Sequence, residues 1–186
     1  MCRVQLCALR MSVPCFVGMT LFCYMKNVRL SPRLKAVVDY INHGAFVADI
    51  GTDHGYVPVY LAQAGIASSI IASDISAGSL EAARRSAEIY GLTDAVKFIV
   101  APGLSGIGQL DADTIVIAGM GGETISSILR DAPWTKHQGI KLILQPQSKI
   151  DVLFKFLYDE GYKIIETKYV REKRKKYVVI CVNNVG

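Results

Sequence analysis

Short apolar segments alternate with helical segments along this chain, and no other feature of the sequence limits its fold more. The expected buried strands cover residues 45–50, 69–73, 96–100, 114–118 and 141–144. The expected helices cover residues 33–41, 56–64, 77–90, 123–130 and 150–159. Strands that alternate with helices form a parallel sheet with helices on both of its faces.

The last two expected strands, at residues 163–170 and 177–182, have no helix between them. The charged segment 171–175 joins them as the turn of a hairpin, so one of these strands must run antiparallel to its neighbour. The sequence therefore predicts one Rossmann-like α/β domain. Its sheet is seven-stranded and mostly parallel, and it ends with a C-terminal antiparallel hairpin.

The length and composition fit a single globular domain. The chain has 186 residues, of which 51% are hydrophobic and 20% charged, and its formal net charge of +5 permits an anionic partner without requiring one. The apolar segment 11–24 is too short and too interrupted to span a membrane. Four of the five cysteines lie in the first 23 residues, and none has the spacing of metal ligands. We therefore expect a cytoplasmic monomer that binds neither a metal nor a membrane.

Residues 1–24 are expected to be a non-native or disordered extension. Arg3 and Arg10 precede the apolar segment, so a signal peptide is the alternative, but no A-x-A-like cleavage site follows. Met25 begins a segment that resembles the N-terminus of a cytosolic protein, so Met25 is the expected natural start of translation. Ser31 and Pro32 then suit the cap and the first position of a helix. The folded domain is expected to cover residues 25–186.

A glycine-containing segment, Asp49-Ile50-Gly51-Thr52-Asp53-His54-Gly55-Tyr56, lies where the first strand turns into a helix. Gly51 permits a tight turn, and Gly55 lets the helix start close to the sheet. Asp53 replaces the central glycine of a dinucleotide-binding fingerprint. A buried carboxylate there would repel a pyrophosphate and attract the ammonium group of a methionine moiety. The segment therefore favours S-adenosylmethionine over NAD, with an ordinary strand-to-helix turn as the alternative.

Three further segments follow strands and meet the same edge of the expected sheet. Asp74 lies about 20 residues past the glycine turn, where an acid binds ribose hydroxyls. Capping of the next helix is its alternative role. Gly119, Gly121 and Gly122 follow the fourth strand and would expose backbone to a ligand, or serve a loop that needs positive φ. Gln145 follows the fifth strand and is a candidate partner for a base edge, or a simple turn residue.

The segments DIGTDHGYVP, IAGMGGETI, LILQPQ and LSPRL closely resemble the bacterial tRNA (adenine(22)-N1)-methyltransferase family. The resemblance covers residues 28–182. It implies a class I methyltransferase fold, S-adenosyl-L-methionine as methyl donor, and N1 of an adenine in the D-arm of tRNA as target. The positions expected to bind the cofactor are Asp49, Gly51, Asp53, His54, Gly55, Asp74, Ile75, Gly103, Gly119 and Met120.

The implied reaction needs positioning more than acid–base chemistry. An unpaired adenine N1 has a free lone pair, so no strong general base is required, but the base must leave its stack. Tyr56 is the candidate for stacking on that base, with packing on the sheet as its alternative. Gly119 and Gln145 complete the expected catalytic set. His54 is expected to be a hydrogen-bonding residue of the loop.

Basic residues at two places are candidates for RNA contact. Arg33 in the first helix is expected to hold a phosphate. Lys173 and Arg174 belong to the densest basic run, although a lysine-rich turn is commonly only solvated and protects an edge strand.

Two features depart from the family pattern. The family usually has Gly-Asp-Gly-Leu after the third strand, where the acid reaches the cofactor's adenine, and this chain has Ala101-Pro102-Gly103-Leu104. The loss of one hydrogen bond is worth ~1 kcal/mol. The family's C-terminal helical domain, which helps to grip tRNA, is expected to be absent. Two alternatives therefore stay open: a methyltransferase acting on a small molecule or a protein, and a catalytically weak homologue that binds cofactor or RNA.

Overall fold

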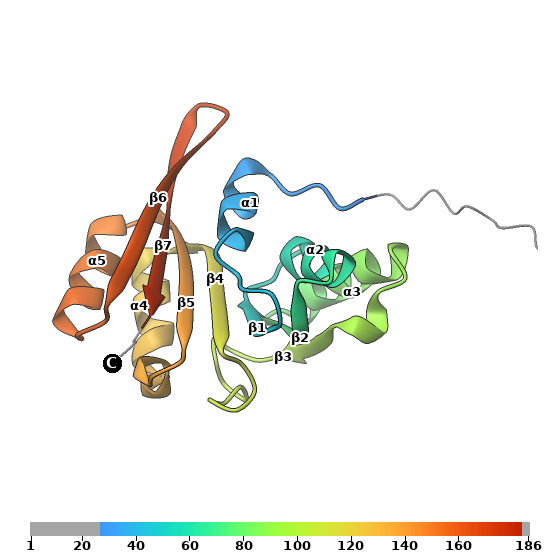
Figure 1. The fold of residues 1–186 in the computed structure, drawn as a ribbon, viewed down its shortest axis with the longest axis horizontal. Helices are drawn as coiled ribbons and strands as arrows, with labels where there is room; N and C mark the ends of the chain where they lie inside the picture. The colour runs from blue at the N-terminus through green and yellow to red at the C-terminus, as the bar shows by residue number, and fades with distance from the viewer. Residues whose placement is uncertain (1–26, 184–186) are drawn as a thin grey trace, which may run out of the picture.

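The computed structural model describes residues 27–183, and they form the predicted α/β architecture (Figure 1). Seven strands make one sheet in the order β3-β2-β1-β4-β5-β7-β6. The strands are β1 (Ala45–Ile50), β2 (Ala67–Asp74), β3 (Lys97–Val100), β4 (Thr114–Gly121), β5 (Lys141–Ser148), β6 (Ile164–Glu172) and β7 (Lys175–Asn183). Neighbouring strands from β3 to β5 are parallel, and β7 runs antiparallel to both β5 and β6. The predicted sheet is confirmed, and the predicted extension at residues 1–24 lies outside the described residues.

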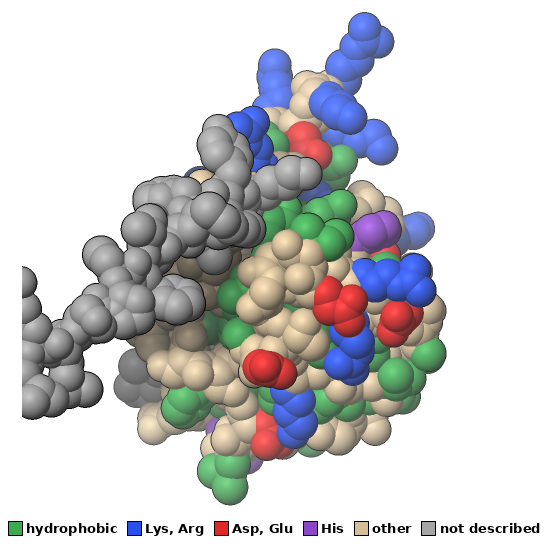
Figure 2. All heavy atoms as spheres, turned by 90° about the vertical axis from the view of Figure 1, so that its right-hand side faces the viewer, with side chains coloured by type: hydrophobic (Ala, Val, Ile, Leu, Met, Phe, Trp, Pro, Cys, Tyr) green, Lys and Arg blue, Asp and Glu red, His purple; other side chains and the backbone are tan. Residues whose placement is uncertain are grey.

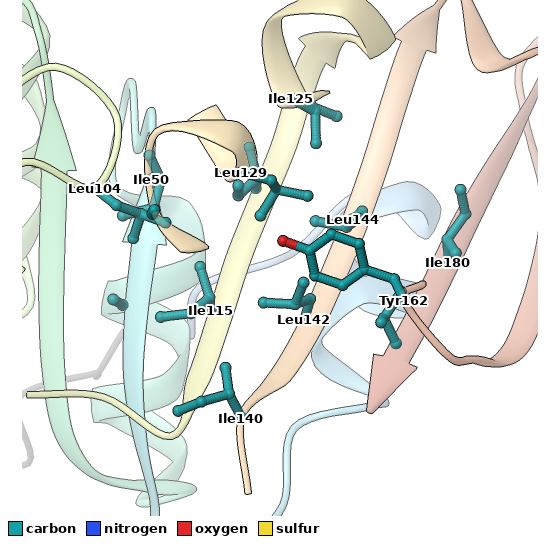
Figure 3. Packing of buried hydrophobic residues seen from close by; sticks show 14 of the residues in the cluster. Ile50, Leu104, Ile115, Ile125, Leu129, Ile140, Leu142, Leu144, Tyr162 and Ile180 are labelled. Carbon is teal, nitrogen blue, oxygen red and sulfur yellow. The ribbon is translucent and has the colours of Figure 1, made fainter. Parts of the chain in front are cut away.

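Helices cover both faces of the sheet because successive strand side chains point to opposite faces. One face carries α4 (Gly122–Arg130) and α5 (Ile150–Asp159), whose apolar residues pack on Ile115 and Ile117 of β4. The other face carries α1 (Pro32–Val38) and α2 (Tyr56–Ala64), which pack around the intervening Val116, and α3 (Ala77–Ile89), which packs against α2, β2 and β3. Figure 3 shows part of the first cluster, including Ile125, Leu129, Leu142, Leu144 and Ile180.

The element types match the prediction, but the fifth strand is longer than the predicted 141–144, and the alternative of Gln145 as a turn residue is wrong. Gln145, Pro146 and Gln147 continue β5, which runs to Ser148. A proline lacks the N–H of a regular ladder. Here the pairing of β4 with β5 shifts register around Met120, the residue opposite Pro146, and so accommodates it.

The C-terminal hairpin is longer than predicted and projects beyond the rest of the sheet (Figure 1). Its turn holds only Lys173 and Arg174, because Lys173 adopts the left-handed conformation with φ 54°. Since β6 runs in the same direction as β5, this turn lies at the carboxyl edge of the parallel strands. No helix within residues 27–183 is long and apolar enough to cross a membrane.

Candidate functional site

A cleft of about 480 Å³ opens at the carboxyl edge of the sheet. Its walls come from the β1–α2 loop, the end of β2, the glycine segment at the end of β4, α1 and the end of β6. Chain order reverses between β1 and β4, and ligands of open α/β sheets bind at such a switch point. The cleft is therefore the candidate site.

The β1–α2 loop has the backbone geometry that its glycines predict. Gly51 and Gly55 adopt φ of 71° and 70°, a region in which other residues are strained. A Cβ on Gly51 would lie 2.1 Å from Cε of Met120, and one on Gly55 would lie 2.8 Å from Cβ of Ala83. Gly51 thus permits the turn beside Met120. Gly55 brings the start of α2 against α3, where close approach to the sheet was predicted.

The buried carboxylate of the cleft belongs to Asp49, not to Asp53. The side chain of Asp53 is 71% exposed and lies 2.9 Å from Nδ1 of His54, so the expectation of burial at Asp53 is wrong. Asp49 is only 4% exposed at the end of β1. Burial, with a smaller contribution from the charge of Asp74, raises the pKa of the Asp49 carboxyl to about 6.

Asp74, at the end of β2, accepts hydrogen bonds from the β1–α2 loop and from the residue that caps α3. Its Oδ2 accepts a hydrogen bond from the backbone N–H of Asp53 at 3.3 Å, and its Oδ1 accepts one from the N–H of Ser76 at 2.8 Å. The N-cap of α3 is Ser76, whose hydroxyl accepts from the N–H of Ser79. Asp74 is therefore not the cap, and each of its oxygens has a second lone pair for a ligand.

Acidic groups outnumber basic ones in the cleft. Four carboxylates and two guanidinium groups line it, those of Asp49, Asp53, Asp74, Glu172, Arg29 and Arg33. A site with this excess of negative charge favours a ligand with a positive centre over a pyrophosphate.

The glycine segment lies at the end of β4, which runs to Gly121 instead of ending at the predicted residue 118, and it adjoins the β1–α2 loop at Met120. Gly119 has φ 86° and lines the cleft with Met120. Gly121 and Gly122 lack positive φ, and a Cβ on Gly122 would lie 2.0 Å from the carbonyl oxygen of Lys149. The three glycines thus differ: Gly119 opens onto the cleft, and Gly122 allows α4 to pack closely.

Two aromatic rings stand at the cleft beside the loop. The rings of His54 and Tyr56 are stacked with centroids 5.7 Å apart and planes 7° from parallel. Tyr56 is 50% exposed, so it does not pack into the core as its alternative reading required.

Arg33 reaches the cleft from α1, whereas Gln145 lies behind it. Nη1 of Arg33 donates to Oε1 of Gln145 at 2.5 Å, and Gln145 is fully buried. Gln147 lines the cleft, in the segment after the fifth strand that was expected to form one of its edges, and Glu172 lines it although the sequence reasoning missed it. Two-residue periodicity, had the strand been extended, would have placed Gln147 on the same face as Gln145.

The remaining predicted site residues do not line the cleft. Ile75 is 72% exposed just after β2. Gly103 lines a separate groove of about 390 Å³ together with Pro102 and Trp134. Lys173 and Arg174 lie at the tip of the hairpin, where Figure 2 shows basic side chains projecting above the body of the molecule. No group of residues within 27–183 could hold a metal ion.

The sheet order, the antiparallel β7 and the cleft at the switch point define a Rossmann-like class I methyltransferase fold. Residues 30–180 match the family model described as a methyltransferase domain. The chain is 38% identical over 156 residues to the tRNA (adenine(22)-N(1))-methyltransferase of Bacillus subtilis, a match that covers 84% of this chain and 66% of that protein. The chain thus spans just under two thirds of that relative.

Solved structures give the same result. The B. subtilis m1A22 tRNA methyltransferase TrmK superposes with a TM-score of 0.78 at 37% identity, covering 86% of this chain and 68% of that one. Streptococcus pneumoniae Sp1610, solved in complex with S-adenosyl-L-methionine, has a TM-score of 0.78 at 33% identity, covering 84% and 74%. This chain belongs to the methyltransferase domain family, in its TrmK-like branch, as the sequence motifs predicted.

Proposed function

We propose that this protein transfers a methyl group from S-adenosyl-L-methionine to N1 of an adenine in tRNA. The observation that carries the proposal is the acidic cleft, in which Asp49 and Asp74 flank the open Gly51 turn at the switch point of the sheet. The names of the similar proteins supply the substrate, adenine 22 of tRNA.

The residues of the cleft fit this cofactor. The volume of about 480 Å³ lies within the usual range for small-molecule sites. Asp74 would hold the ribose hydroxyls, and Asp49 and Asp53 would face the positive groups of the methionine portion. When bound, the cofactor supplies a methyl group on a positively charged sulfur, which an unpaired adenine N1 can take directly.

The protein's own contribution is to orient the base and to exclude water. The exposed face of Tyr56, backed by His54, offers a flat platform on which a flipped adenine would stack. Gly119 adds no side chain of its own to the cleft, so its backbone is open to a ligand there. Arg33, and beyond it the hairpin tip at Lys173 and Arg174, would contact the RNA backbone.

Mass spectrometry of tRNA nucleosides tests the proposal. The protein is incubated with S-adenosyl-L-methionine and unmodified tRNA, and 1-methyladenosine is expected to accumulate. The Asp74→Ala variant should lose most of this product, whereas Asp131→Ala, at an exposed acid after α4, should retain it. Cofactor binding with no methylated tRNA would overturn the proposal. Methyl transfer to metabolites or proteins would then identify a different methyltransferase, and no transfer at all a binding homologue.

We also propose that the protein acts in the cytoplasm, because the proposed substrate is found there, and that it acts as a monomer. Light scattering after size-exclusion chromatography measures the oligomeric state.

A further inference from the structure

We propose that Gln145 and Glu172 are positioning residues that hold Arg33 in the cleft, and that Arg33 binds a phosphate of the RNA substrate. This inference rests on the proposed function. It makes the C-terminal hairpin part of the site, because Glu172 is the last residue of β6, next to the hairpin turn.

Gln145 is fixed by its two hydrogen bonds. Its Oε1 accepts from Nη1 of Arg33 at 2.5 Å, and its Nε2 donates to the carbonyl oxygen of Pro146 at 2.8 Å. Only the amide oxygen can accept from a guanidinium, and only the NH₂ group can donate to a carbonyl, so the orientation of the amide is determined. Since Gln145 is fully buried and both ends are engaged, it acts on a substrate only through Arg33.

Glu172 fixes the same arginine from the hairpin side. Its Oε2 accepts a hydrogen bond from the backbone N–H of Arg33 at 3.1 Å. The hydrogen bond from the Ser31 hydroxyl, together with that N–H and the charge of Arg33, lowers the pKa of the Glu172 carboxyl. The guanidinium of Arg33 also lies over the ring of Tyr177 in β7, with its carbon 5.7 Å from the ring centroid. Gln145 of β5 and Tyr177 of β7 therefore hold the Arg33 side chain, and Glu172 of β6 holds its backbone.

The guanidinium so held faces the cleft beside Gly119. Its Nη1 lies 3.8 Å from the point that a Cβ on Gly119 would occupy, and Nε2 of Gln147 lies 3.5 Å from the same point. A guanidinium has five N–H donors, so its bond to Gln145 leaves the capacity for a bidentate contact with a phosphate. Asp49 and Asp74 come from β1 and β2, whereas Arg33 comes from α1. The carboxylate beside Arg33, that of Glu172, already accepts the backbone N–H of Arg33, so the guanidinium keeps its free donors for an anionic group.

The surrounding surface indicates which anion reaches Arg33. The hairpin tip carries Lys173 and Arg174, which directly follow Glu172, and basic side chains project there above the body of the molecule (Figure 2). A polyanion that approaches along this basic arm would meet Arg33 next. An RNA backbone has this form, whereas a single carboxylate of the cofactor would make no use of the arm.

A double-mutant cycle tests the positioning role. Arg33→Ala, Gln145→Leu and the double variant are compared by kcat, by KM for tRNA and by the Kd of the cofactor. Arg33→Ala and Gln145→Leu should each raise KM for tRNA roughly tenfold, the loss expected from a charge-assisted hydrogen bond. The double variant should be no worse than Arg33→Ala alone, because Gln145 then has nothing to position.

Variants of Glu172 test the positioning of Arg33 without changing a residue of the buried core. Gln145→Leu alters a buried residue, so thermal unfolding is measured first, and Glu172→Ala serves if that variant does not fold. Glu172→Gln keeps an oxygen for the N–H of Arg33 and should restore most of the loss seen with Glu172→Ala. The matched control is Glu160→Ala, which breaks a surface ion pair with Lys136 outside the cleft and should leave KM unchanged.

The outcomes separate this inference from the proposed function. Additive losses in the double variant would overturn the positioning role of Gln145. A weaker Kd for the cofactor with an unchanged KM for tRNA would show that Arg33 holds the cofactor's carboxylate, and would overturn its assignment to RNA. If the wild-type protein transfers no methyl to tRNA, the proposed function fails. The same variants are then compared by their affinity for tRNA in a filter-binding assay. If Arg33→Ala leaves this affinity unchanged, the inference is overturned as well.

Discussion

Replacing Asp49 by asparagine should stabilise the ligand-free protein and weaken its binding of the cofactor. Asp49 is 4% exposed, and burial raises the pKa of its carboxyl from 3.8 to about 6. At neutral pH the carboxylate is therefore charged at a cost to the folded state. Asparagine has nearly the same shape but carries no charge, so it removes this cost.

The size and the pH range of the effect follow from proton linkage. A rise in pKa from 3.8 to about 6 corresponds to about 3 kcal/mol. Between these values the folded protein holds a proton that the unfolded chain has released, so stability falls as the pH rises through this window. About one pH unit above the folded pKa the penalty is complete, and it is constant beyond that point. Asp49→Asn should thus gain up to about 3 kcal/mol at pH 7.5, and progressively less as the pH falls toward 4.

Urea unfolding at pH 4.5 and at pH 7.5 measures the gain, and calorimetric titration with S-adenosyl-L-methionine measures the loss. Cofactor affinity of the wild-type protein should also fall as the pH drops through 6, because the negative partner is then protonated. Asp131→Asn, at an exposed acid, is the control and should show no comparable gain. An Asp49→Asn variant that is no more stable than wild type at pH 7.5 would refute the reasoning.

Three other substitutions probe the cleft. Asp74→Ala should weaken cofactor binding by ~1–3 kcal/mol in calorimetry, since ribose hydroxyls lose a charged partner, and an unchanged affinity removes Asp74 from the site. Tyr56→Ala should reduce kcat/KM for tRNA by about 1–3 kcal/mol while Tyr56→Phe retains it, because stacking needs only the ring; equal losses in both would contradict the platform. Pro102 lines the separate groove, but the N–H of Ala101 donates to the carbonyl oxygen of Asp74 at 3.0 Å, so the loop adjoins a cleft residue. Ala101→Gly combined with Pro102→Asp should improve cofactor affinity by ~1 kcal/mol, with stability measured separately; no improvement in a well-folded variant would show that this loop does not reach the adenine.

Most of the fold could be predicted because it depends on local periodicity. The alternation of segments identified all seven strands and five helices of the described chain, and the helix-free end predicted the antiparallel hairpin. The boundaries that failed depend on contacts between strands. Pro146 is a reasonable strand breaker in isolation, but the shifted register opposite Met120 accommodates it. The hairpin turn is short because Lys173 takes a left-handed φ, which a run of charged residues does not predict.

The residues that line the cleft were predicted where their position follows from a strand end, as for Asp74 and Gly119. They were missed where burial or a distant partner decides the role. Asp49 and Asp53 are four positions apart, and only the structure shows that the loop turns the side chain of Asp53 outward. Glu172 reaches the cleft because the hairpin folds beside α1, a contact across 139 positions that no local pattern contains.

The charges of Asp49 and Arg33, which both line the cleft, should affect stability in opposite directions, and this difference can be measured. Asp49 carries a charge that burial disfavours, so removing the charge should raise the stability of the ligand-free protein. Arg33 carries a charge that Gln145, Glu172 and Tyr177 hold in place, so removing a partner, as in Gln145→Leu, should lower stability by ~1–3 kcal/mol because buried polar atoms lose their bonds. The charge of Asp49 is thus stabilised only when a positive ligand binds, whereas Arg33 is already held in place before an anion binds. If both substitutions shifted stability in the same direction, this contrast between the two charges would be wrong.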